Sequence, residues 1–205
     1  RIDAAFPAFG MAELCIGGTF PRPGAGLRTD VVDGRVLEQE HYAAPVEVGA
    51  AHARELVFLG RAVPGLQLRV VDTDTGELCA DREVGELQIR GTSLMAGYYR
   101  RPDESAELLV DGWLRTGDVA VVDDDGYLFL VDRAKDLIIV SGFNVFPAEV
   151  EEVVLEHPAI EGCAVVGVPH PHTGESVKAY VKARDGMSIE EDDVIDFCAD
   201  RLPHY

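Results

Sequence analysis

The segment Trp113–Glu151 contains three patterned stretches in close succession. In one-letter code they are WLRTGD at residues 113–118, GYLFLVDRAKD at 126–136 and SGFNVFPAEVE at 141–151. Tyr127–Val131 is aromatic and β-branched, which is typical of a strand, and the apolar run 137–140 predicts a second strand. The charged residues between the two runs predict a loop.

Thr116-Gly117-Asp118 predicts a tight turn that ends on a carboxylate. A carboxylate placed in this way can accept two hydrogen bonds from a vicinal diol such as a ribose. The pattern alone leaves a second interpretation open, in which the apolar runs are two strands joined by a solvated turn that has no function.

Short strands are also predicted on the amino-terminal side, at Leu66–Asp72, Gly85–Arg90 and Val119–Val122, each bounded by turn residues. Regularly spaced short strands favour a small β-barrel or a bent sheet. One short helix is predicted at Pro102–Leu109. Residues 21–59 have many glycines and prolines and only brief apolar runs, so we expect them to be irregular.

The carboxyl-terminal part predicts a compact α+β unit. A helix is predicted to begin at Pro147 and to end before Pro158, because proline fits the first turn of a helix but cannot continue one. Strands are expected at Ile160–Val168 and Val177–Ala183, and a second helix from Ile189.

Composition excludes several classes of function. The 205 residues carry a net charge of −19, which argues against nucleic acid as a partner because phosphate binding needs local positive charge. No apolar run is long enough for a transmembrane segment. Cys15, Cys79, Cys163 and Cys198 have no CxxC spacing, so we expect thiols in a reducing cytoplasm, with peripheral membrane attachment left open.

The quoted stretches, together with GELQIRGTSLMAGYYRRP at residues 85–102, closely resemble motifs of the adenylate-forming (AMP-binding) enzymes, in the same order. This superfamily includes acyl-CoA synthetases, fatty acyl-AMP ligases, luciferases and adenylation domains. The resemblance implies a mixed α/β and α+β fold. Residues 1–134 would be the β-barrel-like last part of a large N-terminal AMP-binding domain, and residues 135–205 a small swinging α+β domain.

The resemblance also implies site residues. Phe9, Gly10 and Met11 would bind the adenine part of ATP or AMP, and Glu13 would act in catalysis as a ligand of Mg²⁺, which prefers oxygen donors beside phosphates. Asp118 would bind the ribose hydroxyls. Three further positions complete the set: Arg133 beside ribose or phosphate, Lys135 as the hinge, and Gly142 facing a pantetheine chain.

The implied activity is formation of acyl-AMP from a fatty acid or another carboxylic acid, followed by transfer to coenzyme A. A fatty acyl-AMP ligase that loads an acyl carrier protein is the alternative, because Ala12 replaces the usual threonine and residues 21–59 form a long connection. The segment 131–151 looks more like the fatty acid–CoA ligases, which we favour. A non-catalytic fragment or interaction module also stays open.

The family's phosphate-binding loop and its catalytic lysine are not found in the 205 residues, which open on Arg1 in mid-pattern and suggest a fragment. That lysine supplies electrostatic stabilisation, which is a large part of such catalysis. We therefore predict that the 205-residue chain alone does not adenylate an acid. Acid-dependent release of pyrophosphate from ATP by this chain would contradict the prediction.

Overall fold

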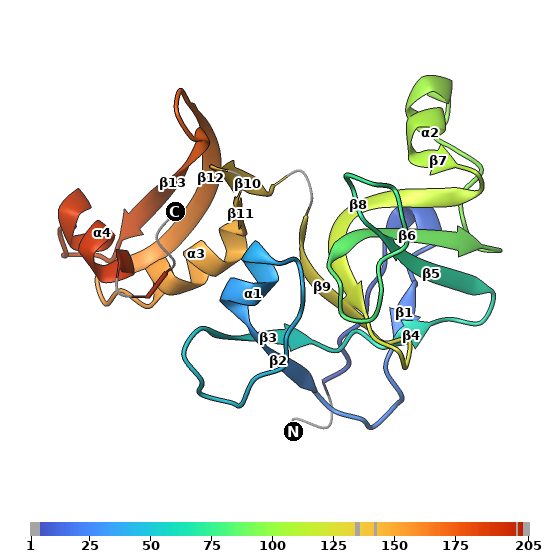
Figure 1. The fold of residues 1–205 in the computed structure, drawn as a ribbon, viewed down its shortest axis with the longest axis horizontal. Helices are drawn as coiled ribbons and strands as arrows, with labels where there is room; N and C mark the ends of the chain where they lie inside the picture. Colours follow the sequence, from blue (N-terminus) through green and yellow to red (C-terminus); the bar gives the residue numbers. More distant parts are fainter. Residues whose placement is uncertain (1–4, 134–135, 142, 200, 203–205) are drawn as a thin grey trace. The chain divides into compact units, whose positions relative to one another are not determined.

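The computed structural model describes residues 5–133, 136–141, 143–199 and 201–202. The chain divides into two compact units (Figure 1). Unit 1 comprises residues 1–37 and 41–134, and unit 2 comprises residues 38–40 and 135–205. Lys135 and Gly142, two of the predicted site residues, lie outside the described residues. The identity of residues 135–205 as a swinging domain stays a prediction.

Unit 1 is built on a five-stranded antiparallel sheet, in which β8 is the central strand. Along one edge β8 pairs with β6, which in turn pairs with β5; along the other edge it pairs with β7 and then with β9 (Figure 1). The predicted strands are confirmed as parts of this bent sheet. The strand bounds are β5 Leu66–Val71, β6 Gly85–Gly91, β7 Leu109–Val110, β8 Trp113–Val122 and β9 Leu128–Arg133.

The turn predicted at Thr116–Asp118 is wrong, because these residues continue strand β8. Gln88 of β6 is paired with Arg115, but Glu86 is paired with Val119, so β8 holds two more residues than β6 over this interval. The extra residues form an irregularity of the β-bulge type at Gly117, whose φ is +71°. Glycine adopts this conformation without the steric cost that a Cβ would bring.

Residues 21–59 are more regular than predicted. They contain an antiparallel pair of strands, β2 Thr29–Asp33 and β3 Ala53–Val57, with helix α1 Gly34–Gln39 between them in the sequence. The Asp33 carboxylate accepts hydrogen bonds from the backbone N–H groups of Arg35 and Val36 at 2.9 and 3.3 Å, as a helix N-cap does. The expectation of an irregular connection is therefore corrected.

The remaining elements of unit 1 are short. A 3₁₀ turn, η2, spans Ala12–Leu14, and strands β1 Thr19–Phe20 and β4 Arg61–Ala62 pair with each other. Helix α2 spans Pro102–Leu108, which confirms the helix predicted there. The core joins these pieces to the sheet. Its buried members are Phe9, Leu14, Leu66, Leu87, Ile89, Leu114, Ala120 and Leu128.

Unit 2 has a four-stranded antiparallel sheet in the order β11-β10-β13-β12. Its predicted helices and strands are confirmed, although α4 begins at Glu191 instead of Ile189. Buried residues of α3 pack with sheet residues in a second core that includes Ile138, Val145, Val154 and Ile160. The bounds are β10 Ile138–Val140, β11 Phe143–Val145, α3 Pro147–Leu155, β12 Ile160–His170, β13 Gly174–Ala183 and α4 Glu191–Ala199.

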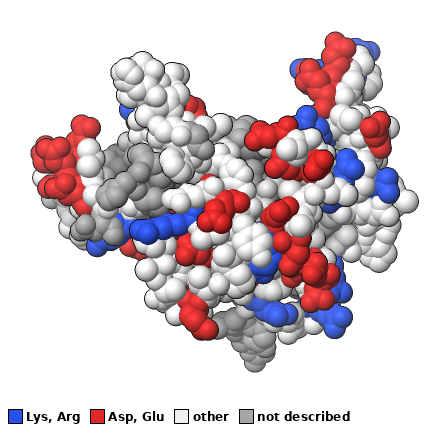
Figure 2. All heavy atoms as spheres, in the orientation of Figure 1, with Lys and Arg blue, Asp and Glu red and all other residues white. Residues whose placement is uncertain are grey.

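Acidic side chains are distributed over the surface. Figure 2 shows Asp and Glu side chains on the described parts of both units, with Lys and Arg interspersed, as expected for a chain of net charge −19. On the face shown, no broad patch of positive charge is present among the described residues, and such a patch is what nucleic-acid binding would need. In that part of the chain, no helix has the length and apolarity needed to cross a membrane.

Gly60 tests how tightly unit 1 is packed. Its φ is +88°, and a Cβ there would lie 1.9 Å from the carbonyl carbon of Phe20. Gly76 is a matched control, because its φ is +75° and nothing lies within 4 Å of its Cβ position. We predict that Gly76→Ala lowers the free energy of unfolding of unit 1 by about 1 kcal/mol, from backbone strain alone. Gly60→Ala should lower it by about 3 kcal/mol, because backbone must also move.

Denaturant unfolding followed by Trp113 fluorescence measures both variants, since Trp113 is the single tryptophan and lies in unit 1. Equal losses in the two variants would contradict the close contact between Gly60 and Phe20.

Candidate functional site

Glu13 lies in a closed loop of unit 1. The backbone N–H groups of Leu14 and Ile16 both donate to the Met11 carbonyl at 3.1 Å. The N–H groups of Gly18 and Thr19 donate to the Phe9 carbonyl at 2.9 and 3.0 Å, which closes the loop at its base. Glu13 is thereby held on a compact turn instead of a free segment.

Gly10 has a structural reason to be glycine. A Cβ at this position would lie 1.7 Å from the Ile16 carbonyl oxygen, so the chain could not fold back over residue 10. Ile16 itself has a φ of +88°, a rare conformation for a β-branched residue, and its side chain is 82% exposed. Backbone strain of this kind tends to occur at functional sites.

The neighbouring predicted adenine contacts differ in burial. Phe9 is only 7% exposed and belongs to the core of unit 1, and Met11 is half-buried against the same core. Gly10 is exposed. Of the three, Gly10 presents the most accessible surface to a flat ligand, whereas Phe9 and Met11 support the loop from the core side. Their roles in binding adenine stay predictions.

Tyr98 contacts Glu13 directly. The Tyr98 hydroxyl donates a hydrogen bond of 2.6 Å to Glu13 Oε1. The segment that contains Tyr98 also contacts the backbone of Glu13, because the Met95 N–H donates to the Glu13 carbonyl at 2.8 Å. The hydrogen bond to the carboxylate raises the pKa of Tyr98, with further contributions from burial and from the charges of Glu13 and Glu104.

Asp118 and Arg133 form a second pair, and both of its members are predicted site residues. They are directly opposite each other on β8 and β9, so their side chains lie on the same face of the sheet. Arg133 Nε donates to Asp118 Oδ1 at 3.2 Å. The Asp118 side chain is 10% exposed and that of Arg133 is 55% exposed. A pair with one solvated partner contributes little to stability, so its main effect is to orient the carboxylate.

Thr116 fixes the backbone next to Asp118. Its hydroxyl donates to the Leu87 carbonyl at 2.8 Å and accepts from the Asp118 N–H at 3.1 Å. These two bonds span the irregular interval of β8, where the regular ladder with β6 is interrupted. The position of Asp118 is therefore determined by a side chain two residues earlier as well as by its strand partner.

Among the predicted site residues that it describes, the structure brings Asp118 together with Arg133, and it pairs Glu13 with Tyr98, which was not predicted. Sequence reasoning missed Tyr98 and Thr116. Tyr98 belongs to the stretch 85–102, in which we predicted no site residue, and it lies 85 residues from its partner. The only signal in the sequence was the motif itself, and the motif does not indicate which of its side chains faces Glu13.

The donor set is consistent with a metal that is held mostly by a nucleotide. In the described residues, no group of three or more His, Cys, Asp or Glu side chains could hold a metal ion by itself. Within the same residues Glu13 Oε1 accepts from Tyr98, and Oε2 has no hydrogen-bond partner. Protein-bound Mg²⁺ commonly uses one or two carboxylates and takes its other ligands from phosphates and water. Glu13 fits that requirement.

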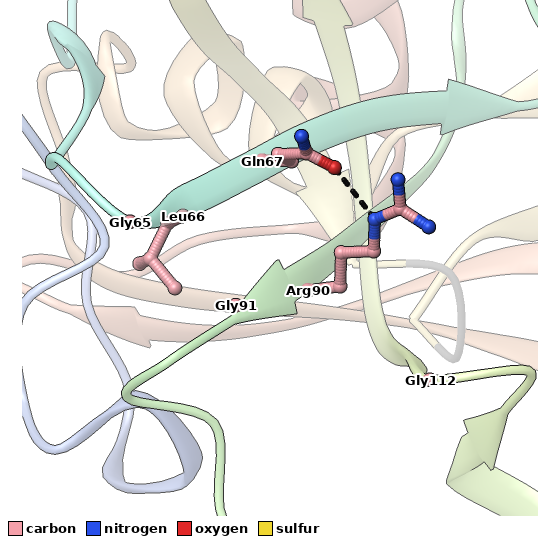
Figure 3. Close-up of a pocket in the computed structure, with 6 residues that line it drawn as sticks. All are labelled: Gly65, Leu66, Gln67, Arg90, Gly91 and Gly112. Atoms are coloured by element: carbon pink, nitrogen blue, oxygen red, sulfur yellow. Dashed lines mark hydrogen bonds between the residues drawn. The ribbon is translucent and has the colours of Figure 1, made fainter.

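Two of the cavities that the described residues line lie elsewhere. One, of about 430 Å³, is at the ends of β5 and β6, where Figure 3 shows Gln67 and Arg90 reaching toward each other. Arg90 Nε donates to Gln67 Oε1 at 2.6 Å, and its guanidinium lies 4.5 Å from the Trp113 ring centroid. The other, of about 720 Å³, is apolar and lies between α3, β13 and α4. None of the described candidate residues lines either cavity.

Comparison with protein families gives two matches. The model described as "AMP-binding enzyme" matches residues 4–99, and the model described as "AMP-binding enzyme C-terminal domain" matches residues 149–205. The first match contains Glu13 and Tyr98. The two models lie in the order in which an N-terminal and a C-terminal domain would follow each other.

Curated relatives are similar over most of this chain but are much longer. A long-chain-fatty-acid–CoA ligase of Salmonella typhimurium is 46% identical over 147 residues, which is 72% of this chain and 26% of the relative. The enzyme of the same name from Yersinia pestis is 39% identical over 175 residues, 85% of this chain and 28% of the relative. The chain therefore spans about a quarter of the length of these relatives.

Solved structures match almost the whole chain. Fatty acyl-adenylate ligases from E. coli and L. pneumophila match with a TM-score of 0.82 and 28% identity, over 98% of this chain and 36% of the matched chain. ATP-bound MatB from Rhodopseudomonas palustris matches with a TM-score of 0.73 and 30% identity, over 98% and 34%. The mixed, sheet-rich fold predicted from the sequence is therefore confirmed.

The Tyr98–Glu13 hydrogen bond makes a prediction about titration. The raised pKa of Tyr98 means that the folded chain holds this proton more tightly than the unfolded chain does. The contribution of this proton to the stability of the folded chain is fully present below the ordinary tyrosine pKa. It is lost as pH rises through the pKa of Tyr98 in the folded chain. We predict that Glu13→Gln lowers the pKa of Tyr98, because it removes the charged acceptor.

Ultraviolet difference titration, with Tyr98→Phe subtracted as the reference, measures this pKa. An unchanged Tyr98 pKa in Glu13→Gln would show that the carboxylate is not its partner.

Proposed function

Because the chain belongs to the AMP-binding enzyme family, we propose that the complete protein is an ATP-dependent acyl-activating enzyme. It forms acyl-AMP from a fatty acid and transfers the acyl group to coenzyme A. The observation that carries this proposal is the Asp118–Arg133 pair, a buried carboxylate oriented from the neighbouring strand by a guanidinium that remains accessible.

Asp118 is suited to bind the ribose of the nucleotide. A carboxylate has two oxygens and about four lone-pair sites, and Arg133 uses one side of Oδ1 only. The remaining capacity matches the two hydroxyl donors of a ribose. Hydrogen bonds to a charged acceptor are among the stronger ones, so this carboxylate would contribute substantially to nucleotide affinity. Arg133, being more exposed, is placed to contact the ribose or a phosphate.

Glu13 would hold Mg²⁺ through its carboxylate, with the other ligands coming from ATP and water. When bound, the ion neutralises charge on the phosphates and orients them. The contribution of this chain is to keep the Glu13 carboxylate in place by the closed loop and by Tyr98. Gly10, which leaves room for the Ile16 carbonyl, maintains that loop.

The proposed reaction has two steps. A carboxylate oxygen of the acid bonds to the α-phosphorus of ATP, and the bond from that phosphorus to pyrophosphate breaks. The sulfur of a thiol then bonds to the acyl carbon, and AMP leaves with the electron pair of the broken C–O bond. Between the steps, unit 2 would rotate about Lys135, and Gly142 would face the pantetheine chain, as the family resemblance implies.

Two acceptor thiols, those of coenzyme A and of a carrier protein, each have specific observations in their favour. Coenzyme A is favoured by relatives named long-chain-fatty-acid–CoA ligase at 39–46% identity. A carrier-protein acceptor is favoured by Ala12 in place of the threonine and by the TM-score of 0.82 to fatty acyl-adenylate ligases, whose identity is lower at 28%. Sequence identity is the stronger guide here, because a shared fold is compatible with many functions.

Product identification distinguishes the two acceptors. The complete protein is supplied with Mg²⁺, ATP, coenzyme A and fatty acids of several lengths, and the products are identified by mass. We expect acyl-CoA, AMP and pyrophosphate. Acyl-AMP that accumulates despite coenzyme A would move the protein to the acyl-AMP ligases. Neither product with any acid would contradict the enzyme proposal and favour a non-catalytic module.

Asp118→Ala tests the ribose site. We predict that the KM for ATP rises by about tenfold or more, because each lost hydrogen bond to a charged group is worth about 1.5–3 kcal/mol. Asp125→Ala is the matched control, since Asp125 lies on the exposed turn between β8 and β9 with its side chain 81% exposed. Steady-state kinetics with varied ATP measure both. An Asp118→Ala enzyme with the control's KM would remove this residue from the site.

A further inference from the structure

Tyr98 is connected to Glu13 in a way that a structural tyrosine does not require. Its hydroxyl donates to Glu13 Oε1 at 2.6 Å, a short bond of the kind formed with a charged acceptor. In the described chain Glu13 Oε2 keeps no hydrogen-bond partner. One carboxylate oxygen is therefore fixed by the protein, and the other remains for a ligand.

The backbone of Tyr98 is also fixed by hydrogen bonds. The Tyr98 N–H donates to the Ser105 hydroxyl at 2.8 Å, and that hydroxyl donates at 2.6 Å to the carbonyl of Arg101, the N-cap residue of α2. Gly97 allows this approach, because its φ is +143° and a Cβ there would lie 3.0 Å from Ser105 Oγ. Hydrogen bonds to α2 thus fix the backbone of Tyr98, and the phenol bonds to Glu13 on η2.

We propose that Tyr98 is a positioning residue for the metal-binding carboxylate: its phenol fixes Glu13 Oε1 so that Oε2 is the oxygen available to the Mg²⁺ of Mg²⁺–ATP. This inference rests on the proposed function and adds a residue to it. Tyr98 does not touch the reacting atoms. It acts by limiting the rotation of a carboxylate that would otherwise lose freedom only when the ion binds.

The test compares Tyr98→Phe with Tyr99→Phe in the complete protein. Tyr99 is the matched control, because it is adjacent in sequence, 83% exposed, and contacts the Arg100 guanidinium instead of a carboxylate. Titration calorimetry with Mg²⁺–ATP, without acid, measures binding independently of turnover. Steady-state rates at varied Mg²⁺ then give the half-saturating Mg²⁺ concentration and kcat separately.

We expect Tyr98→Phe to weaken Mg²⁺–ATP binding by about tenfold, the scale of one hydrogen bond to a charged group, and to raise the half-saturating Mg²⁺ concentration in proportion. Tyr99→Phe should match the wild type. A loss of kcat with unchanged Mg²⁺–ATP affinity would overturn the proposal.

Ser105→Ala is the second variant, in case Tyr98→Phe does not fold. It keeps the phenol but removes the partner of the Tyr98 N–H, so it should weaken Mg²⁺–ATP binding in the same direction by a smaller factor. Wild-type affinity in this variant would overturn the proposal as well. A wild-type protein that binds no Mg²⁺–ATP would instead overturn the proposed function, so the two failures are distinguishable.

Discussion

The pairing of β8 with strands on both of its edges is the constraint on which the proposed nucleotide site depends. β6 lies along one edge of β8, and β9 follows β7 along the other. Asp118 begins the ladder with β9 and lies in the interval where the ladder with β6 is interrupted. The irregular interval around Gly117 shifts the register with β6, while Asp118 remains directly opposite Arg133. Thr116 connects the interval back to β6 through the Leu87 carbonyl. The carboxylate is therefore placed by the sheet and does not depend on a mobile loop.

The Glu13 carboxylate is also positioned by other parts of the chain. Glu13 lies on a short turn whose backbone is closed onto Phe9 and Met11, and its carboxylate is reached by Tyr98 from a distant part of the chain. Each proposed ligand-binding carboxylate of unit 1 thus has one hydrogen-bonding partner from outside its own segment. Such support restricts the carboxylates before a ligand arrives, which is the usual basis of preorganised binding.

Local patterns in the sequence predicted β5, β6, β9, β10, β12, β13 and the second half of β8, because alternation and β-branched residues are strong signals. The other described strands were not predicted. Local patterns failed where one pattern has two structural solutions. Thr116-Gly117-Asp118 has the composition of a turn, but the same glycine conformation serves a bulge inside a strand. Residues 21–59 looked irregular because β2 and β3 are separated by α1 and a loop. The Tyr98–Glu13 contact spans 85 residues and is determined by tertiary packing alone.

A double-mutant cycle on AMP binding tests the central claim most directly. The dissociation constant of AMP is measured by calorimetry for the complete protein and for Asp118→Asn, Arg133→Gln and the double variant. If Arg133 acts by orienting Asp118 for the ribose, the double variant should bind about as weakly as Asp118→Asn alone, with a coupling energy of about 1 kcal/mol. The account would be contradicted if the two substitutions changed the dissociation constant of AMP by factors that multiply in the double variant. It would also be contradicted if the single variants bound AMP like the wild type.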